Sequence, residues 1–135
     1  MTENVASAAE PPGFTLSVSD AGGGKRVVAA AGELDIVGAA QLLRAVAVLR
    51  RPVTSAVAID LSALTFIDSS GINALRSAVR AANARGVGAI VAAPSQRVER
   101  VLELVKLADI LPLEHSLADA FQRLDSDGSP EPRKA

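Results

Sequence analysis

The chain has 135 residues, 49% of them hydrophobic, with 14 basic and 15 acidic side chains and a net charge of -1 at pH 7. This length and apolar content predict one globular domain and exclude a largely disordered chain. The balanced charge, together with an aromatic content of only 2%, gives no electrostatic or stacking reason to expect nucleic acid or an anionic membrane as a partner. The sequence has no cysteine, which excludes disulfides and thiolate catalysis.

Polar segments flank the apolar part of the chain. Residues 1–13 are rich in Ala, Glu and Pro and carry neither a basic start nor an apolar run, so we expect a disordered tail and not a signal peptide. Residues 125–135 are polar and contain Gly and Pro, which predicts a flexible C-terminal tail. The folded domain is therefore expected to span residues 14–124. Its apolar runs all fall short of the roughly 18 residues that a membrane span needs.

The first elements expected are a hairpin and a helix. Residues 14–18 alternate apolar and polar side chains, and residues 26–31 form a second strand after a glycine-rich turn. A helix is expected from Ile36 to Arg50, with Asp35 as its N-cap. Its predicted buried stripe consists of Ala40, Leu43, Val46 and Ala47.

The middle of the chain predicts a central strand followed by a helix. Residues 56–61 are apolar almost throughout, as expected of a strand that is buried on both faces. The helix is marked by apolar residues at three- and four-residue spacing and ends near Arg85 and Gly86; its stripe is Ile72, Leu75, Val79 and Ala82. Asp68, Ser69, Ser70 and Gly71 stand between the two elements, where a Ser or Asp side chain can cap the helix. Gly71 leaves room for the close approach of another backbone or a ligand.

The last third predicts alternating short strands and helices. A strand is expected over residues 88–92, and Pro94 and Ser95 open a helix that buries Val98, Val101, Leu102 and Val105. Residues 108–113 are expected to add a brief edge strand, and Ser116 to cap a final helix that ends at Leu124. Strands separated by helices imply parallel pairing with right-handed crossovers, to which the hairpin adds an antiparallel strand. The sequence thus predicts an α/β fold with a small mixed sheet.

Two short motifs resemble a known family. The string from Phe66 to Gly71, Phe-Ile-Asp-Ser-Ser-Gly, is similar to the signature of the STAS domain, in particular that of the anti-sigma factor antagonists. The string Gly-Glu-Leu-Asp from Gly32 to Asp35 is similar to a second element of that family. The resemblance covers residues 14–124. It implies a STAS-like fold, in which an N-terminal hairpin and parallel strands are covered by four α-helices.

The resemblance also implies a site. In this family the first serine after the aspartate is phosphorylated by a kinase that is also the anti-sigma factor, which makes Ser69 the expected phosphoacceptor. Asp68 would hold the turn and face the kinase, and the loop at Asp35 would border the same surface. Ser70 and Gly71 would shape the first helical turn and complete the expected partner-binding set.

The implied function is that of a regulatory switch in the cytoplasm. The unphosphorylated chain would bind a histidine-kinase-like anti-sigma factor and free the sigma factor. Phosphorylation by that serine kinase would release the chain, and a serine phosphatase would reset it. The chain would be a monomer or weak dimer without catalytic residues, cofactor or metal of its own.

Three alternatives compete with this interpretation. The first is a STAS subunit of a lipid-transport or stress-signalling assembly. The second is a small hydrolase with Ser69 as nucleophile, whose base would have to be His115, the only histidine of the sequence. The third is a divalent-cation site formed by Glu33, Asp35, Asp60 and Asp68, against which stands the simpler interpretation that these aspartates cap helices and end a strand.

Overall fold

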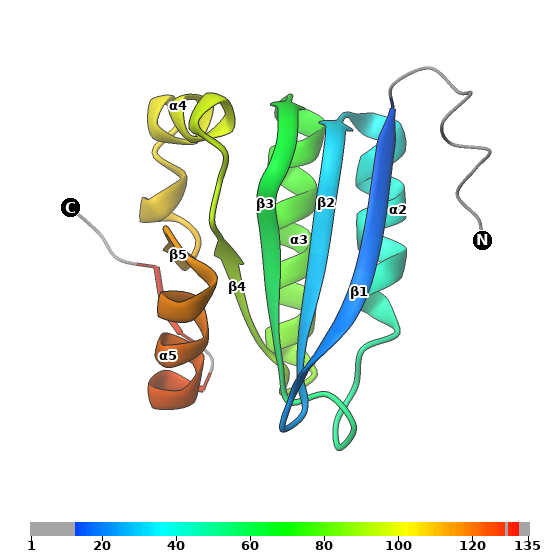
Figure 1. The fold of residues 1–135 in the computed structure, drawn as a ribbon, viewed down its shortest axis with the longest axis vertical. Coiled ribbons are helices and arrows are strands. Elements are labelled where there is room, and N and C mark those ends of the chain that lie inside the picture. The colour runs from blue at the N-terminus through cyan, green and yellow to red at the C-terminus, as the bar shows by residue number, and fades with distance from the viewer. Residues whose placement is uncertain (1–12, 129, 133–135) are drawn as a thin grey trace.

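The computed structural model describes residues 13–128 and 130–132 of the chain. These residues form one sheet with helices packed on it (Figure 1). The strands are β1 (Phe14–Gly22), β2 (Lys25–Leu34), β3 (Ala56–Ile67), β4 (Gly88–Ala92) and β5 (Leu113–Glu114). The helices are α2 (Ile36–Ala47), α3 (Ser69–Ala84), α4 (Gln96–Leu104) and α5 (Leu117–Asp127), with a 3-10 turn, η1 (Leu107–Asp109). The α/β class and the four helices expected from the sequence are confirmed.

The sheet is mixed, as predicted. Its strands follow one another in chain order, β1-β2-β3-β4-β5. β1 and β2 pair antiparallel as a hairpin, and the remaining neighbours pair in parallel. The hairpin turn is tighter than expected, because β1 runs to Gly22 and β2 begins at Lys25. The glycines at and between these ends have φ angles of 90°, 63° and 83°, a conformation that glycine adopts without strain.

Two apolar clusters lie on opposite faces of β3 and β4. Val57 and Ile59 belong to the larger cluster, which α2 and α3 cover. Ala58 and Ile90 belong to a smaller cluster, which α5 covers. The alternation of side chains along a strand explains why neighbouring residues of β3 fall into different clusters. The prediction that the central strand is buried on both faces is therefore confirmed.

The buried face of α2 differs from the prediction. Of the expected stripe only Val46 is buried, whereas Ala40, Leu43 and Ala47 are exposed. The residues that α2 buries are Gly38, Ala39, Leu42 and Val46. The prediction failed because α2 is apolar on almost every side, so that periodicity alone does not select the face that packs on the sheet.

Several boundaries also differ. α2 ends at Ala47 and not at Arg50, and β3 continues to Ile67, well past residue 61. Val105 follows the end of α4 and is 46% exposed, so its predicted burial was wrong. The expected edge strand over residues 108–113 is mostly the turn η1 and a loop, and only Leu113 and Glu114 pair with β4.

The C-terminal helix continues past the expected domain boundary. α5 runs to Asp127, so the boundary at residue 124 falls inside it. Arg123 is only 7% exposed; its guanidinium pairs with Glu114 at 3.0 Å and donates to the carbonyl oxygen of Glu131. Pro130 is buried as well. Most of the expected N-terminal tail, residues 1–12, lies outside the described residues.

Candidate functional site at the ends of strands 2 and 3

Asp35 and Asp68 follow the ends of two neighbouring parallel strands. Leu34, the last residue of β2, is the register partner of Ile67, the last residue of β3. The next residue in each case is the N-cap of a helix, Asp35 for α2 and Asp68 for α3. The backbone N–H of Asp68 also donates to the carbonyl oxygen of Leu34 at 3.4 Å. Both sequence motifs are therefore brought together at the end of the sheet where β2 and β3 stop.

The two caps satisfy backbone donors that a helix start leaves free. One oxygen of Asp35 accepts hydrogen bonds from the N–H groups of Val37 and Gly38, each at 3.1 Å. One oxygen of Asp68 accepts from the N–H of Gly71 at 3.0 Å. A carboxylate in this position also lies at the positive end of the helix dipole. The predicted capping role of both aspartates is confirmed.

Ser69 is the first helical residue of α3 and does not cap it. The sequence allowed either Ser or Asp as the cap, and the structure gives that role to Asp68. The Ser69 side chain is exposed, and its hydroxyl has no hydrogen-bond partner in the part of the chain that the structure describes. Ser70, next to it, is partly buried. The hydroxyl of Ser69 is thus free to meet an incoming molecule.

Gly71 fits the turn because no side chain is tolerated there. An added Cβ would lie 2.5 Å from the carbonyl oxygen of Leu34 and 2.8 Å from Cγ1 of Ile67. The close approach expected at this glycine is thus made by the backbone at the end of β2. We refer to residues Asp68 to Gly71 as the Ser69 turn.

Exposed apolar side chains lie next to these two helix starts. They were not among the site residues expected from the sequence. Ile36 and Val37, in the first turn of α2, are 72% and 63% exposed, and Phe66, near the end of β3, is 47% exposed. Phe66 is the register partner of Glu33, which is also exposed. Periodicity could not identify them, because Ile36 continues the expected stripe of Ala40 and Leu43 at helical spacing.

The aspartate carboxylates of this region accept hydrogen bonds from backbone N–H groups. Asp60, the third candidate for a cation site, accepts from the N–H of Ser62 at 2.9 Å. In residues 13–128 and 130–132, no group of three or more His, Cys, Asp or Glu side chains is arranged to hold a metal ion. The simpler interpretation of Asp35, Asp60 and Asp68 as capping and turn residues is the one that the structure bears out.

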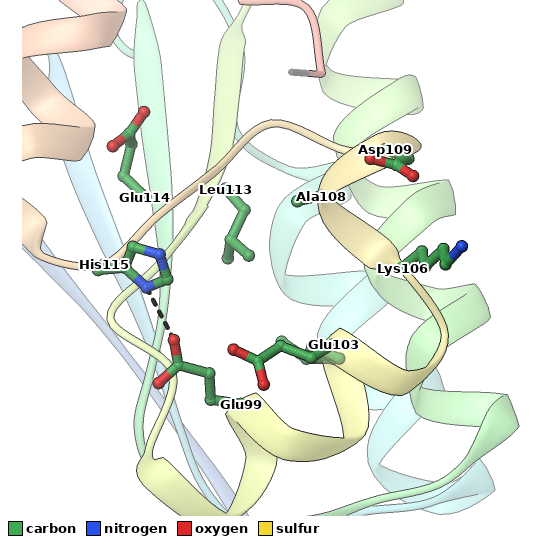
Figure 2. Close-up of a pocket in the computed structure, with 9 residues that line it drawn as sticks. Glu99, Glu103, Lys106, Ala108, Asp109, Leu113, Glu114 and His115 are labelled. Atoms are coloured by element: carbon green, nitrogen blue, oxygen red, sulfur yellow. Dashed lines mark ion pairs between the residues drawn. The ribbon is translucent and has the colours of Figure 1, made fainter. Parts of the chain in front are cut away.

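His115 belongs to a different part of the molecule. It lies between β5 and α5, and its Nδ1 is 3.0 Å from a carboxylate oxygen of Glu99 (Figure 2). The two side chains line a pocket to which Ser69 does not contribute. The arrangement gives no support to the hydrolase alternative, in which His115 would activate Ser69.

Comparison with known proteins agrees with this fold and these motifs. The model of the STAS domain family matches residues 19–120. A solved anti-sigma factor antagonist from Mycobacterium paratuberculosis is 31% identical, with a TM-score of 0.71 over 84% of this chain and 95% of that one. The chain therefore belongs to the STAS domain family, and within it to the anti-sigma factor antagonists.

Two more distant structures share the fold. SpoIIAA of Bacillus, a cell fate determinant solved in its phosphorylated form, is 19% identical, with a TM-score of 0.60 over 82% of this chain and 99% of that one. A sulfate transporter family protein from Wolinella succinogenes is 16% identical, with a TM-score of 0.64 over 76% and 86% of the two chains. In this chain, no helix within the described residues has the length and apolar character needed to cross a bilayer.

Proposed function

We propose that the chain counteracts an anti-sigma factor by binding it at the surface around the Ser69 turn, and that phosphorylation of Ser69 ends this binding. The observation that carries the proposal is the exposed, unpartnered hydroxyl of Ser69 at the ends of the two neighbouring strands whose flanking residues Ile36, Val37 and Phe66 are exposed. A partner that covered Ile36, Val37 and Phe66 would gain from the burial of apolar surface. The same partner would enclose the Ser69 hydroxyl.

The scaffold beneath this surface favours binding without large rearrangement. The Asp35 and Asp68 caps fix the first turns of α2 and α3, and the packing of Gly71 on Leu34 joins them. Residues held in this way lose little conformational entropy when a partner binds. Membership in the family supports an anti-sigma factor as that partner.

The switching reaction uses a hydroxyl of this chain and the chemistry of its partners. Bound to the anti-sigma factor kinase with magnesium, ATP would transfer its γ-phosphoryl group to Oγ of Ser69, which gives up its proton as ADP leaves. A serine phosphatase would hydrolyse the ester and restore the hydroxyl. The chain is thus substrate and ligand in the cytoplasm and not an enzyme, and it needs no cofactor of its own. The phosphorylated form of the relative SpoIIAA supports this cycle.

The position of Ser69 explains how a phosphate would change binding without unfolding the domain. Ser69 is the first residue of α3, where free N–H groups and the helix dipole favour an anion. A phosphoserine adds nearly two negative charges beside the Asp68 carboxylate. Burying this charge under a partner that accepts a neutral serine costs free energy unless cations meet it.

Phosphotransfer assays test the proposal. The purified chain is incubated with magnesium, ATP and each histidine-kinase-like anti-sigma factor encoded in the same genome, and the modified residue is located by mass spectrometry. We expect one of these proteins to phosphorylate Ser69, to phosphorylate a Ser70→Ala variant as well, and to leave a Ser69→Ala variant unmodified. Failure of every candidate kinase, or phosphorylation at a different residue, would contradict the proposal.

A further inference from the structure

Exposed apolar side chains gather on two separate parts of the surface. Eight of the ten large hydrophobic side chains that are exposed in the described residues fall into two groups. The first group lies on α2 and in the loop after it: Ile36, Val37, Leu43, Val48 and Val53. The second lies at the end of α4 and next to η1: Leu104, Val105 and Ile110. Exposed patches of this kind mark interaction surfaces.

The first group forms a helix face that nothing in the described chain covers. We define the α2 face as the exposed side of α2 and its C-cap: Ile36, Val37, Ala40, Leu43, Arg44, Ala47 and Val48. The opposite side of α2 packs into the core. A helix that is apolar all round is normally buried on all sides. The α2 face is therefore expected to pack against another molecule.

The charges on the α2 face and in the loop after it are all positive, whereas Glu33 and Asp35 precede the helix. Between Ile36 and Val53 the chain carries Arg44, Arg50 and Arg51 and not one acidic residue. Arg44 lies in the middle of the α2 face, is exposed, and has no ion-pair partner among the described residues. A binding partner should therefore combine apolar surface with carboxylates.

A groove of that character lies on the same elements as the second group, although Leu104, Val105 and Ile110 do not line it. A pocket of about 450 Å³ lies between α4, η1 and β5, with Leu102, Ala108 and Leu113 among its apolar lining residues. Its acidic lining residues are Glu99, Glu103, Asp109 and Glu114, and its basic ones are Lys106 and His115. Figure 2 shows Glu99 and Glu103 extending from α4 toward His115 and Leu113, while Lys106 points away from them. We call this pocket the α4 groove.

Not all of these carboxylates are held by internal pairs. Glu99 pairs with His115, and Glu114 pairs with Arg123. Glu103 is exposed, and neither it nor Asp109 has an ion-pair partner in the described part of the chain. The α4 groove thus combines apolar lining with carboxylates that can accept an arginine from another molecule.

The two surfaces cannot meet within one molecule. α2 packs under β1 and β2 at one edge of the sheet, whereas the α4 groove lies at the β5 edge (Figure 1). Symmetric pairing of two α2 faces would bring Arg44 toward a second Arg44, which like-charge repulsion disfavours. Pairing of the α2 face of one copy with the α4 groove of the next joins opposite charges and covers the apolar side chains of the α2 face and the apolar lining of the groove.

We propose that the α2 face binds the α4 groove of a second copy of this chain, so that copies associate head to tail. Such contacts are heterologous and do not close into a dimer, so that each copy keeps one free α2 face or one free groove for the next. The contact does not use the Ser69 hydroxyl, but it shares Ile36 and Val37 with the surface proposed for the anti-sigma factor, so the two contacts would compete. It goes beyond the proposed function and is tested on the purified chain alone, without an anti-sigma factor.

Sedimentation velocity and light scattering over a wide concentration range test the proposal on the purified full chain. We expect the weight-average mass to rise steadily with concentration beyond that of a dimer, and to fall when salt is added, because screening weakens the charge pairs. A mass that stays at the monomer value at all concentrations would overturn the proposal. So would a plateau at the dimer mass, which indicates a symmetric pair.

Charge reversal on each side sharpens the test. Arg44→Glu should block the α2 face and Glu103→Arg the α4 groove, each weakening self-association at least about tenfold. A mixture of the two variants should recover self-association. Glu103→Arg supplies an unchanged α2 face, Arg44→Glu supplies an unchanged α4 groove, and the reversed charges at positions 44 and 103 also attract each other. Arg80→Glu and Asp119→Arg, which alter exposed residues of α3 and α5, are the matched controls and should associate as wild type.

The mixing experiment and a lipid-binding experiment decide whether the α2 face binds a second copy of the chain or a lipid surface. A mixture that stays monomeric while each variant is folded by circular dichroism would overturn the head-to-tail contact. Binding of wild type, but not Arg44→Glu, to anionic phosphatidylserine vesicles without any self-association would assign the α2 face to a lipid surface instead and would likewise overturn the proposal.

Discussion

The carbonyl oxygen of Leu34 lies so close to Gly71 that a Cβ on residue 71 would be only 2.5 Å from it. This contact fastens the first turn of α3 to the end of β2, one residue before the Asp35 cap. The two motifs that identify the family, separated by thirty residues in the sequence, are thereby held together at one surface.

Replacing Gly71 tests this contact. Gly71→Ala places a methyl group against a backbone carbonyl, which cannot move aside as a flexible side chain can, and should lower the free energy of unfolding by about 1–3 kcal/mol. Denaturant unfolding followed by circular dichroism measures the change. Ser77→Ala, at an exposed position of α3, is the control and should leave stability unchanged or slightly raised. Equal stability of Gly71→Ala and wild type would show that the turn can relax.

Substitutions of Asp68 test how much its side-chain cap contributes to the stability of the domain. Asp68→Ala leaves the N–H of Gly71 without its acceptor and should cost about 0.5–2 kcal/mol of stability. Asp68→Asn keeps an acceptor oxygen in the same place and should cost much less. Thermal and denaturant unfolding of both variants distinguish them, and equal losses would mean that the carboxylate charge and not the cap provides the stabilisation.

The helix caps were predicted more accurately than the helix faces, for physical reasons. Capping at Asp35 and Asp68 depends on residues close in sequence, so the motif and the strand-to-helix change were sufficient to place it. In α3 the arginines at positions 76 and 80 mark the outer face, and Leu75, Val79 and Ala82 were correctly predicted as buried. In α2 only Gln41 and Arg44 are polar, too few to orient the helix.

Other features depend on long-range contacts that a single sequence does not reveal. The exposure of Phe66 near the Ser69 turn depends on β3 continuing to Ile67, beyond the residues that pair with β4. The C-terminal segment folds back because Arg123 finds acceptors on Glu114 and Glu131. Its polar composition alone predicted a loose tail.

Truncation tests the docking of this C-terminal segment. A chain that ends at Leu124 loses the last turn of α5, the Asp125 partner of Lys25 at 3.0 Å, and the Glu131 carbonyl that Arg123 contacts. Because Arg123 is buried, the loss of its acceptor should cost about 1–3 kcal/mol and lower the melting temperature. Calorimetry on this chain and on one ending at Pro132 measures the effect. The longer chain should melt as the full protein does, and identical melting of the shorter one would restore the boundary expected from the sequence.

Ser69 variants separate folding from binding. Since Asp68 and not Ser69 caps α3, Ser69→Ala should change stability by no more than about 0.5 kcal/mol. Ser69→Asp adds one negative charge at the positive end of α3 and should also keep the fold. Denaturant unfolding should therefore give three similar curves for wild type and both variants. A large loss for Ser69→Asp would mean that a charge at this position acts by unfolding the turn.

The central claim is tested most directly by titrating the anti-sigma factor that phosphorylates Ser69 with the unmodified and the Ser69-phosphorylated chain, in isothermal calorimetry at fixed salt. We expect the phosphorylated chain and Ser69→Asp to bind at least about tenfold more weakly than wild type, and Ser69→Ala to bind as wild type does. Equal or tighter binding of the phosphorylated chain would contradict this claim.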